Sequence, residues 1–487
     1  MKIQMEIFRK IKNENIRYIH WKSSEHLTQA MQGYTDLDIL VHEEDEVLLV
    51  HILEDAGFRR FQSIGKQQYI SIQDYLLFDS EGQKLLHFHL HSRLALGTRF
   101  FKEYVLPIEQ DLLENRIWDK INCIYTINYT YEIVLLWVRY CVKQDFMKFA
   151  FHGGKISKHY LRESFWLQDR INLKEVEVIA KKIFNDEVFA SLLVDFIQTN
   201  YNRKSFIRLM KRVKKIMKKY RSNSFVKIRY YFEKVHMILN YIKQRFFSMA
   251  IPYRRINPSG GSIITFIGAD GSGKTSLYKH TKKIMEKKID VYSQYFGSGD
   301  GKSSFLRYPM ILAQRVLKKI INRPVKKVSN TFDLSKKNKI TFSKLLWAIS
   351  LTIEKKRKLF KVWKARNSGM MVLCDRYPQT QFMNINDGPL LSGWLSENGF
   401  RKRIALWERR TYELAQVLKP DLVIKLNVDV DTAIKRKPFE KYEVVARKIE
   451  LIKELEIPCG YCIEIDACKS FEEVVKNAFD AISNQLQ

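Results

Sequence analysis

Residues 263–276 read IITFIGADGSGKTS, and this stretch decides the fold of the C-terminal part of the chain. Its first five residues are mostly β-branched or aromatic, which predicts a buried strand. They run directly into the pattern G-x-x-x-x-G-K-S/T, whose glycines let successive backbone N–H groups turn inward around a polyphosphate. A helix that begins near Lys274 adds its positive N-terminal end. The stretch therefore predicts a phosphate-binding loop in a nucleotide-binding enzyme.

The side chains of this loop have separate expected roles. Lys274 is placed to reach the β- and γ-phosphates of a nucleotide, and Thr275 to hold magnesium. The alternative is a chance glycine turn, which the strand on one side and the helical run on the other disfavour. The residues expected to bind ATP are Gly268, Gly271, Ser272, Gly273, Lys274, Thr275 and Ser276, together with the later Arg436.

A second apolar run supports the same domain. Residues 370–374 read MMVLC, as a central parallel strand should, and they are followed by Asp375 and Arg376. A carboxylate at the end of a strand beside a phosphate loop faces the magnesium shell, and Arg376 can hold a second phosphate through two hydrogen bonds. We predict Lys274, Asp375 and Arg376 as catalytic residues and Thr275 and Asp375 as magnesium ligands. The alternative is a buried ion pair of structural use.

The phosphate loop together with Asp375-Arg376-Tyr377 resembles thymidylate kinase and its relatives among the nucleoside monophosphate kinases, over residues 261–487. The resemblance implies an α/β fold with a parallel sheet flanked by helices. It also implies Mg²⁺-dependent transfer of a phosphoryl group from ATP to an acceptor, as in the conversion of dTMP to dTDP. It implies that Asp270 contacts the acceptor sugar and that Arg376 and Tyr377 contact the acceptor. Cations from the lid are expected to stabilise the moving phosphoryl group, with Arg436 and Arg447 as candidates.

The sequence departs from that family where the acceptor is chosen. Residues 295–301 replace the family's Arg-Glu-Pro-Gly segment, residues 384–389 replace its Ser and Tyr-Gln pattern, and residues 302–366 form a lysine-rich helical insertion. The prediction is therefore a kinase for a small phosphorylated acceptor, whose identity stays open.

Near the N-terminus, residues 33–41 read GYTDLDILV. Residues two apart on a strand share a face, so Asp36 and Asp38 can bind one divalent cation together. A glycine followed by Asp-x-Asp at a strand resembles the nucleotidyltransferase superfamily, which implies a small α+β domain over residues 1–110 that holds a triphosphate and magnesium. The alternative is that the two carboxylates only cap a turn.

A third carboxylate, usual in such transferases, is missing from the expected neighbouring strand, residues 84–91. That strand presents histidines instead, and carboxylates lie only upstream of it. The histidines either ligate a metal or are hydrogen-bonded groups on a half-buried strand, so the domain can bind a substrate without transferring anything. The residues concerned are His87, His89 and His91, with Asp74 and Asp79 as substitutes.

Residues 111–258 are predicted to form a basic helical connector. Residues 201–255 hold 17 lysines and arginines and a single acid, Glu233, a net charge of +16. Apolar residues recur at helical spacing over 206–220 and again over 228–242. The favoured interpretation is that these faces pack on a neighbouring domain; the alternative is that residues 201–250 lie on an anionic membrane surface. No recognition motif supports nucleic acid.

Composition bounds the rest. A chain of 487 residues predicts two or three domains, here 1–110, 111–258 and 261–487, and a net charge of +31 predicts an acidic partner. Six scattered cysteines predict a reducing cytoplasm without a disulfide framework, and the Cys459–Cys462 pair is interpreted as incidental. No run is apolar over the length of a bilayer, so we expect a cytoplasmic protein, soluble or peripheral on the inner face of the membrane.

Three hypotheses follow. The first is the ATP-dependent kinase, and the fused order of domains resembles the thymidylate kinases named in bacterial surface-polysaccharide gene clusters. The second is a nucleotidyltransferase of surface-polysaccharide synthesis whose phosphate-loop domain only senses nucleotide. The third is a non-catalytic, membrane-docked nucleotide-binding scaffold.

Overall fold

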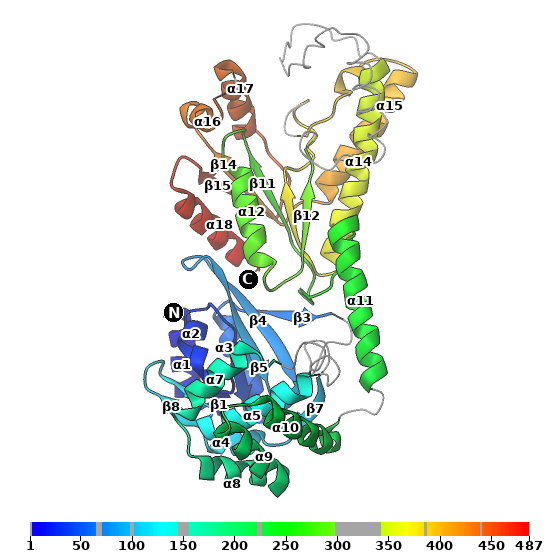
Figure 1. The fold of residues 1–487 in the computed structure, drawn as a ribbon. Helices are drawn as coiled ribbons and strands as arrows, with labels where there is room; N and C mark the ends of the chain where they lie inside the picture. The colour runs from blue at the N-terminus through cyan, green and yellow to red at the C-terminus, as the bar shows by residue number, and fades with distance from the viewer. Residues whose placement is uncertain are drawn as a thin grey trace. The chain divides into compact units, whose positions relative to one another are not determined.

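The computed structural model describes residues 2–64, 71–97, 102–144, 155–221, 226–297, 342–383, 387–438 and 441–486. Two compact units divide them. Unit 1 comprises Met1–Leu77 and Lys84–Tyr241, and unit 2 comprises Phe78–Gln83 and Ile242–Leu486 (Figure 1). Parts of the segments that depart from the kinase family, residues 298–341 and 384–386, lie outside the described residues.

Unit 2 is built on a five-stranded sheet in the order β12-β13-β11-β14-β15, in which every neighbouring pair is parallel. The three central strands are almost entirely buried, as their near-continuous apolar sequences predict. The strands of this unit are β10 (Arg255–Ile256), β11 (Ile263–Gly268), β12 (Val291–Tyr295), β13 (Met371–Asp375), β14 (Leu422–Asn427) and β15 (Tyr461–Asp466). The predicted parallel α/β sheet is confirmed.

Helices cover both faces of this sheet. The chain moves outward from β11 to β12 through α12 and returns to β13 through α14, so right-handed crossovers place these two helices on opposite faces. Helix α12 packs beside α18, and α14 beside α15 (Figure 1). The helices are α12 (Lys274–Met285), α14 (Phe342–Asn367), α15 (Phe400–Val417), α16 (Val430–Arg436), α17 (Tyr442–Lys453) and α18 (Phe471–Leu486).

Unit 1 contains a mixed sheet whose strands run in the order β3-β4-β5-β2-β1-β9-β8. Strand β2 pairs antiparallel with β1 and parallel with β5, in a register that sets Asp38 beside His89 and Leu40 beside His91. The strands are β1 (Tyr18–His20), β2 (Leu37–Val41), β3 (Arg59–Ser63), β4 (Ile72–Asp79), β5 (Lys84–His91), β8 (Ile117–Asp119) and β9 (Ile124–Thr126), with the separate pair β6 (Leu94–Gly97) and β7 (Lys102–Leu106).

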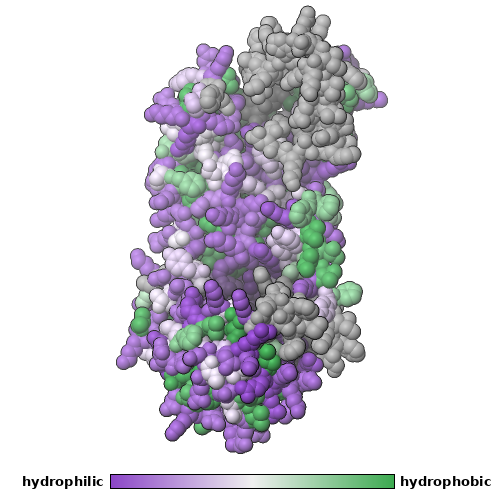
Figure 2. All heavy atoms as spheres, in the orientation of Figure 1, coloured by the Kyte–Doolittle hydropathy of each residue, from purple (hydrophilic) through white to green (hydrophobic). Residues whose placement is uncertain are grey.

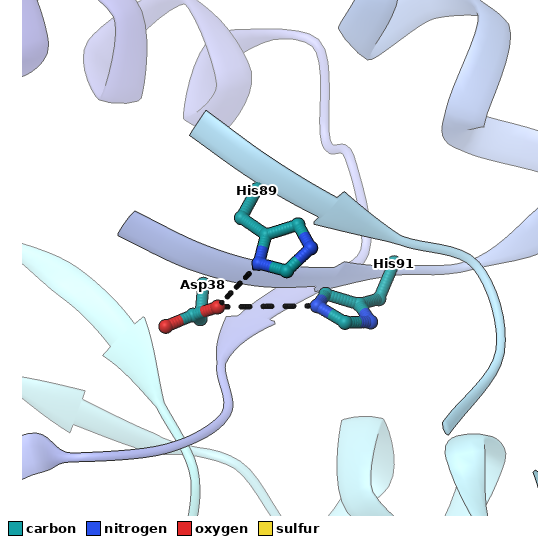
Figure 3. Close-up of side chains that lie close together, drawn as sticks. All are labelled: Asp38, His89 and His91. Atoms are coloured by element: carbon teal, nitrogen blue, oxygen red, sulfur yellow. Dashed lines mark hydrogen bonds and ion pairs between the residues drawn. The ribbon is translucent and has the colours of Figure 1, made fainter. Parts of the chain in front are cut away.

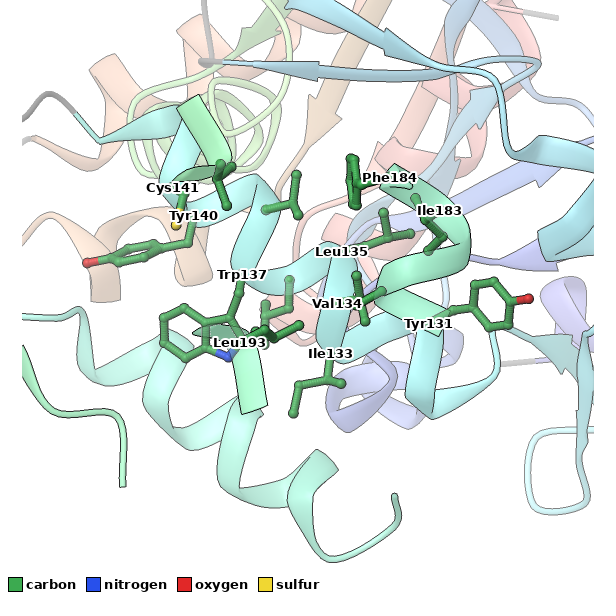
Figure 4. Packing of buried hydrophobic residues seen from close by; sticks show 14 of the residues in the cluster. Tyr131, Ile133, Val134, Leu135, Trp137, Tyr140, Cys141, Ile183, Phe184 and Leu193 are labelled. Carbon is green, nitrogen blue, oxygen red and sulfur yellow. The ribbon is translucent and has the colours of Figure 1, made fainter. Parts of the chain in front are cut away.

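The larger core of unit 1 surrounds α5, a helix that is buried on all sides from Thr130 to Val142. Trp137 is one of the fully buried side chains of this core (Figure 4). Its ring is edge-on to that of Phe196, with 4.5 Å between the ring centroids. The helices of the unit are α1 (Lys2–Asn13), α2 (Leu27–Met31), α3 (Glu46–Asp55), α4 (Glu109–Glu114), α5 (Tyr129–Lys143), α7 (Lys158–Gln168), α8 (Leu173–Phe184), α9 (Glu187–Gln198) and α10 (Arg203–Ile216); α11 (Val226–Phe247) contains the boundary with unit 2.

The first of the two basic helices belongs to this core. Phe206, Leu209, Met210 and Val213 of α10 are buried with α5, and the lysines of α10 lie on its other sides. Residues 111–220 therefore share a unit with the N-terminal strands, whereas the sequence suggested a separate connector. The reason is that the apolar face of α10 finds its partner in α5. Among the described residues, no helix has the length and apolar character needed to cross a membrane.

We predict that Trp137→Ala lowers the free energy of unfolding of unit 1 by about 3–5 kcal/mol, the usual loss for truncating a fully buried aromatic side chain. Urea unfolding followed by intrinsic fluorescence and circular dichroism measures this loss. Trp118→Ala, at a partly exposed tryptophan of β8, is the matched control and should cost far less. Equal losses in the two variants would contradict the packing described for α5.

Candidate functional site

The phosphate loop joins the end of β11 to the start of α12. Gly271 and Gly273 have φ values of 85° and 82°, in the left-handed region that favours glycine. A Cβ atom on Gly271 would approach the Ala433 carbonyl to 2.6 Å, and one on Gly268 would lie 2.4 Å from the Ser272 hydroxyl. A side chain at either position would therefore collide with α16 or with the serine of the loop, which explains the glycines there.

Lys274 folds back over this loop. Its side chain is buried, and its Nζ donates a hydrogen bond to the Ala269 carbonyl at 3.3 Å and lies 3.6 Å from Asp270 Oδ1. Asp270 is also the neighbour of cations from three other places in unit 2. Their distances to its carboxylate are 2.9 Å for Lys448, 3.5 Å for Arg376 and 3.9 Å for Lys437. Four cations therefore share one carboxylate at the mouth of the loop.

The electrostatics of this cluster favour an anion. Burial raises the pKa of the Asp270 carboxyl, but Lys274 and Lys448 outweigh it and hold that pKa below its ordinary value. Burial and the neighbouring Arg376 lower the pKa of the Lys274 ammonium group. All four cations approach Asp270, while Asp375 also lies near Lys274 and Asp387 acts on Arg376. A polyphosphate would bring several negative charges to the same groups.

Thr275 and Asp375, the two predicted magnesium ligands, lie side by side next to the loop. The parallel register of β11 and β13 places Phe266 opposite Asp375, and the Thr275 hydroxyl donates to Asp375 Oδ2 at 3.4 Å. The other carboxylate oxygen, Oδ1, is buried without a hydrogen-bond partner among the described residues. Burial also raises the pKa of Asp375, against the effect of Lys274. A buried, unsatisfied carboxylate oxygen next to a hydroxyl is a donor set that fits Mg²⁺.

The side chains of the two residues after Asp375 point to different places, Arg376 to the loop and Tyr377 to the core. Arg376 has a left-handed backbone with a φ of 69°, donates its N–H to the Phe266 carbonyl at 3.0 Å, and lies 3.5 Å from Asp270 Oδ1. Tyr377 is fully buried, its hydroxyl donates to the Leu418 carbonyl, and its ring packs edge-on against Phe296. The expected contact of Tyr377 with an acceptor is therefore corrected to a packing role.

Of the two cations expected in the lid, Arg436 contacts the phosphate loop and Arg447 does not. Arg436 donates to the Gly271 carbonyl at 3.3 Å and so contacts the loop itself, whereas Arg447 pairs with Glu450 on its own helix at 2.6 Å. Lys448 takes the place expected for Arg447. Helix phase is the signal that was missed, because Lys448 follows the buried Val445 by three residues and precedes the buried Ile452 by four.

Two serines complete the loop. Ser272 is buried, and its N–H donates to the Ala269 carbonyl at 3.2 Å. Ser276 is exposed in the first turn of α12, with its N–H bonded to the Gly273 carbonyl at 3.0 Å. Both serines lie at the phosphate loop, and the contacts that the structure describes for Asp270 do not include their side chains.

Unit 1 contains a second cluster, built on the β2–β5 register. Asp38 Oδ1 lies 3.0 Å from His89 Nδ1 and 3.9 Å from His91 Nε2 (Figure 3). Asp38, His89 and His91 have ligand atoms within 4.8 Å of one another, close enough to share a metal ion. Within the described ranges this is the one group of three or more histidine, cysteine, aspartate or glutamate side chains with that property. Asp36 is not part of it: its Oδ1 lies 2.9 Å from His87 Nδ1. The expected Asp36–Asp38 pair is thus divided between different histidines.

Carboxylates and a lysine surround these histidines. Asp74, one of the two expected substitutes, lies 2.8 Å from His87 Nε2, whereas Asp79 accepts a hydrogen bond from the Gly82 N–H in a turn. Lys22 Nζ lies 2.7 Å from Asp38 Oδ1. Burial lowers the pKa of both His89 and His91, which favours the neutral imidazole that ligates metals.

Lys22 also lines a cavity of about 180 Å³ within unit 1. Four cations line this cavity, and among the lining residues that are described Glu163 is the one carboxylate. Burial and like-charged neighbours lower the pKa of Lys102 to about 7 and that of Lys143 to about 8. Such crowding is relieved by a bound anion. The four cations are Lys22, Lys102, Arg139 and Lys143.

Comparison with known proteins places the chain near two bacterial proteins. No protein-family model matches it. The uncharacterized ATP-binding protein YghR of Escherichia coli K12 is 28% identical over 228 residues, which cover 45% of this chain and 86% of YghR. The uncharacterized ATP-binding protein YghS of the same strain is 25% identical over 244 residues, which cover 47% of this chain and 96% of YghS.

We predict that Asp270→Asn destabilises unit 2 by roughly 1.5–3 kcal/mol, the range for hydrogen bonds to charged groups, because the four cations lose their shared partner. The pKa of Asp270 lies below its ordinary value of 3.8, so its contribution is present at neutral pH and is lost as the pH falls below 3.8.

Thermal unfolding at neutral pH, with and without pyrophosphate, measures the effect. Pyrophosphate should stabilise the Asp270→Asn variant more than the wild type, since it supplies the missing negative charge. Asp431→Asn, an exposed acid of α16, is the control and should leave the midpoint unchanged. A variant as stable as the wild type would show that the cations do not depend on Asp270.

Proposed function

We propose that unit 2 is a kinase that binds ATP and Mg²⁺ at the phosphate loop and transfers the γ-phosphoryl group to a small phosphorylated acceptor. The observation that carries the proposal is the convergence of Lys274, Arg376, Lys437 and Lys448 on Asp270, beside the Thr275–Asp375 pair. The names of YghR and YghS as ATP-binding proteins support the choice of nucleotide.

Each part of this site has a task in such a reaction. The amides of the glycine loop hold the β- and γ-phosphates, and Lys274 neutralises them from within. Thr275 and Asp375 would hold Mg²⁺, which neutralises charge on the phosphates when it is bound. Lys437 and Lys448 lie where charge develops on the transferring group. Arg376 positions the phosphate of the acceptor through its guanidinium.

The acceptor is proposed to be a nucleoside monophosphate or a related phosphate monoester. Two phosphates meeting in line need cations on both sides, and Lys274 approaches Asp270 from the start of α12 whereas Arg376 approaches it from the end of β13. The resemblance to thymidylate kinase makes dTMP the first acceptor to test. The loss of the family's acceptor segments makes other nucleoside and sugar monophosphates equal members of the panel.

The test measures ADP formed from ATP and Mg²⁺ with each member of a panel of nucleoside and sugar monophosphates. One acceptor should stimulate ADP release, and Lys274→Ala should lower kcat by at least about 100-fold, as expected for loss of a charge at the transition state. The control is Lys279→Ala, an exposed lysine of the same helix. If ATP binds but no acceptor supports turnover, the kinase proposal fails.

Unit 1 supports a second candidate function, transfer of a nucleotidyl group. The specific observation is the basic cavity beside the Asp38 cluster, with Lys22 common to both. One carboxylate and two imidazoles suit a first-row transition metal better than Mg²⁺. The cavity is smaller than the roughly 300–1,000 Å³ of pockets that enclose whole drug-sized ligands, so it suits the phosphates of a nucleotide.

Pyrophosphate release from a nucleoside triphosphate tests this second function. Release should persist in Lys274→Ala, because that lysine belongs to unit 2, and should disappear in Asp38→Asn. Asp55→Asn, at an exposed position of α3, is the control for a lost surface charge. Release that requires Lys274, or that survives Asp38→Asn, would assign the chemistry elsewhere.

A further inference from the structure

Helix α11 presents an apolar face outward. Six large apolar side chains recur along it at three- and four-residue spacing and are all exposed, with Phe232 at 77% and Phe246 at 68%. Figure 2 shows apolar side chains gathered along this part of the surface. We call the six the apolar stripe: Tyr231, Phe232, Val235, Ile238, Ile242 and Phe246.

The opposite side of the same helix is polar and less exposed. Asn240 is buried, and Glu233 and Gln244 are half-buried, at positions roughly half a turn from the stripe. A surface helix of a globular protein ordinarily does the reverse and turns its apolar side inward. Helix α10, with a similar sequence pattern, does so by burying Phe206 and Leu209. The outward stripe of α11 therefore marks a contact surface.

The charged residues beside the apolar stripe indicate the chemistry of its partner. Lys243 and Arg245 are exposed on the two flanks of the stripe, and α11 has five basic residues against the single acid Glu233. A helix with an apolar face edged by lysine and arginine matches a bilayer interface, where acyl chains lie beneath anionic headgroups. Nucleic acid offers no comparable apolar surface.

We propose that α11 docks in the plane of an anionic lipid surface, with the apolar stripe at the boundary between headgroups and acyl chains and with Lys243 and Arg245 at the lipid phosphates. An amphipathic helix in the interface needs no membrane-spanning length, in keeping with the properties of the described helices. This placement is independent of the kinase reaction of unit 2.

Vesicle flotation of the full chain tests the proposal. The protein should float with vesicles of phosphatidylcholine and phosphatidylglycerol in equal parts and stay at the bottom with phosphatidylcholine alone. The double variant Phe232→Gln/Phe246→Gln should lower the partition coefficient at least about tenfold through lost apolar burial. Lys243→Gln/Arg245→Gln should lower it about fivefold per charge and weaken its dependence on salt.

The matched control is Val178→Gln/Val188→Gln, which removes exposed apolar side chains from α8 and α9 and should float like the wild type. Circular dichroism of each variant checks that its helix content is kept. No flotation with the anionic vesicles, or flotation unchanged by the stripe variant, overturns the proposal. So does a dimer in analytical ultracentrifugation that the stripe variant dissociates, since the stripe then belongs to a second copy of the chain.

Discussion

Parallel pairing of β11 with β13 is the constraint on which the candidate site of unit 2 depends. It sets Phe266 opposite Asp375 and so brings a carboxylate to the edge of the sheet where the phosphate loop leaves β11. The Arg376 N–H donates to the Phe266 carbonyl at the end of this ladder, and the chain then turns with a left-handed φ of 69° at Arg376. A shift of one residue in this register would turn Asp375 away from Thr275 and Arg376 away from Asp270.

The charge balance at the loop follows from this geometry. Lys274 begins α12 and Arg376 directly follows β13, whereas Lys437 and Lys448 come from the segment around α16 and α17. Asp270 lies between both groups, and burial disfavours the charged form of Lys274, whereas the side chain of Lys437 is 53% exposed. Under the proposed function, a polyphosphate would take over these cations from Asp270, and the cluster is arranged in advance for such an exchange.

The sequence predicts those parts of the site that local chemistry determines. The glycines of the loop, the strands β2 and β5, and the order of Asp375 and Arg376 follow from turn geometry and from the two-residue period of strands. Tyr377 could not be placed in this way, because only packing against Phe296 and Leu418 shows that it faces the core. Lys22 lies next to Asp38 because β1, which ends two residues before Lys22, pairs with β2. No local sequence pattern predicts that contact.

The two basic helices also show that sequence periodicity does not determine which apolar face is buried. They further show that the positive charges of the chain lie in different environments. Both α10 and α11 have apolar residues at helical spacing among lysines and arginines, but only α10 buries its apolar side. At the phosphate loop and in the cavity of unit 1, the cations are enclosed, and burial lowers the pKa of Lys274 and Lys102. A buried cation is stabilised most by a counter-charge at short range, which suits small anions. The cations beside the stripe of α11 stay in solvent, where attraction acts over a Debye length and suits an extended charged surface. The net charge of +31 therefore combines buried cations, whose effect is short-ranged, with solvent-exposed cations, whose effect extends over a Debye length.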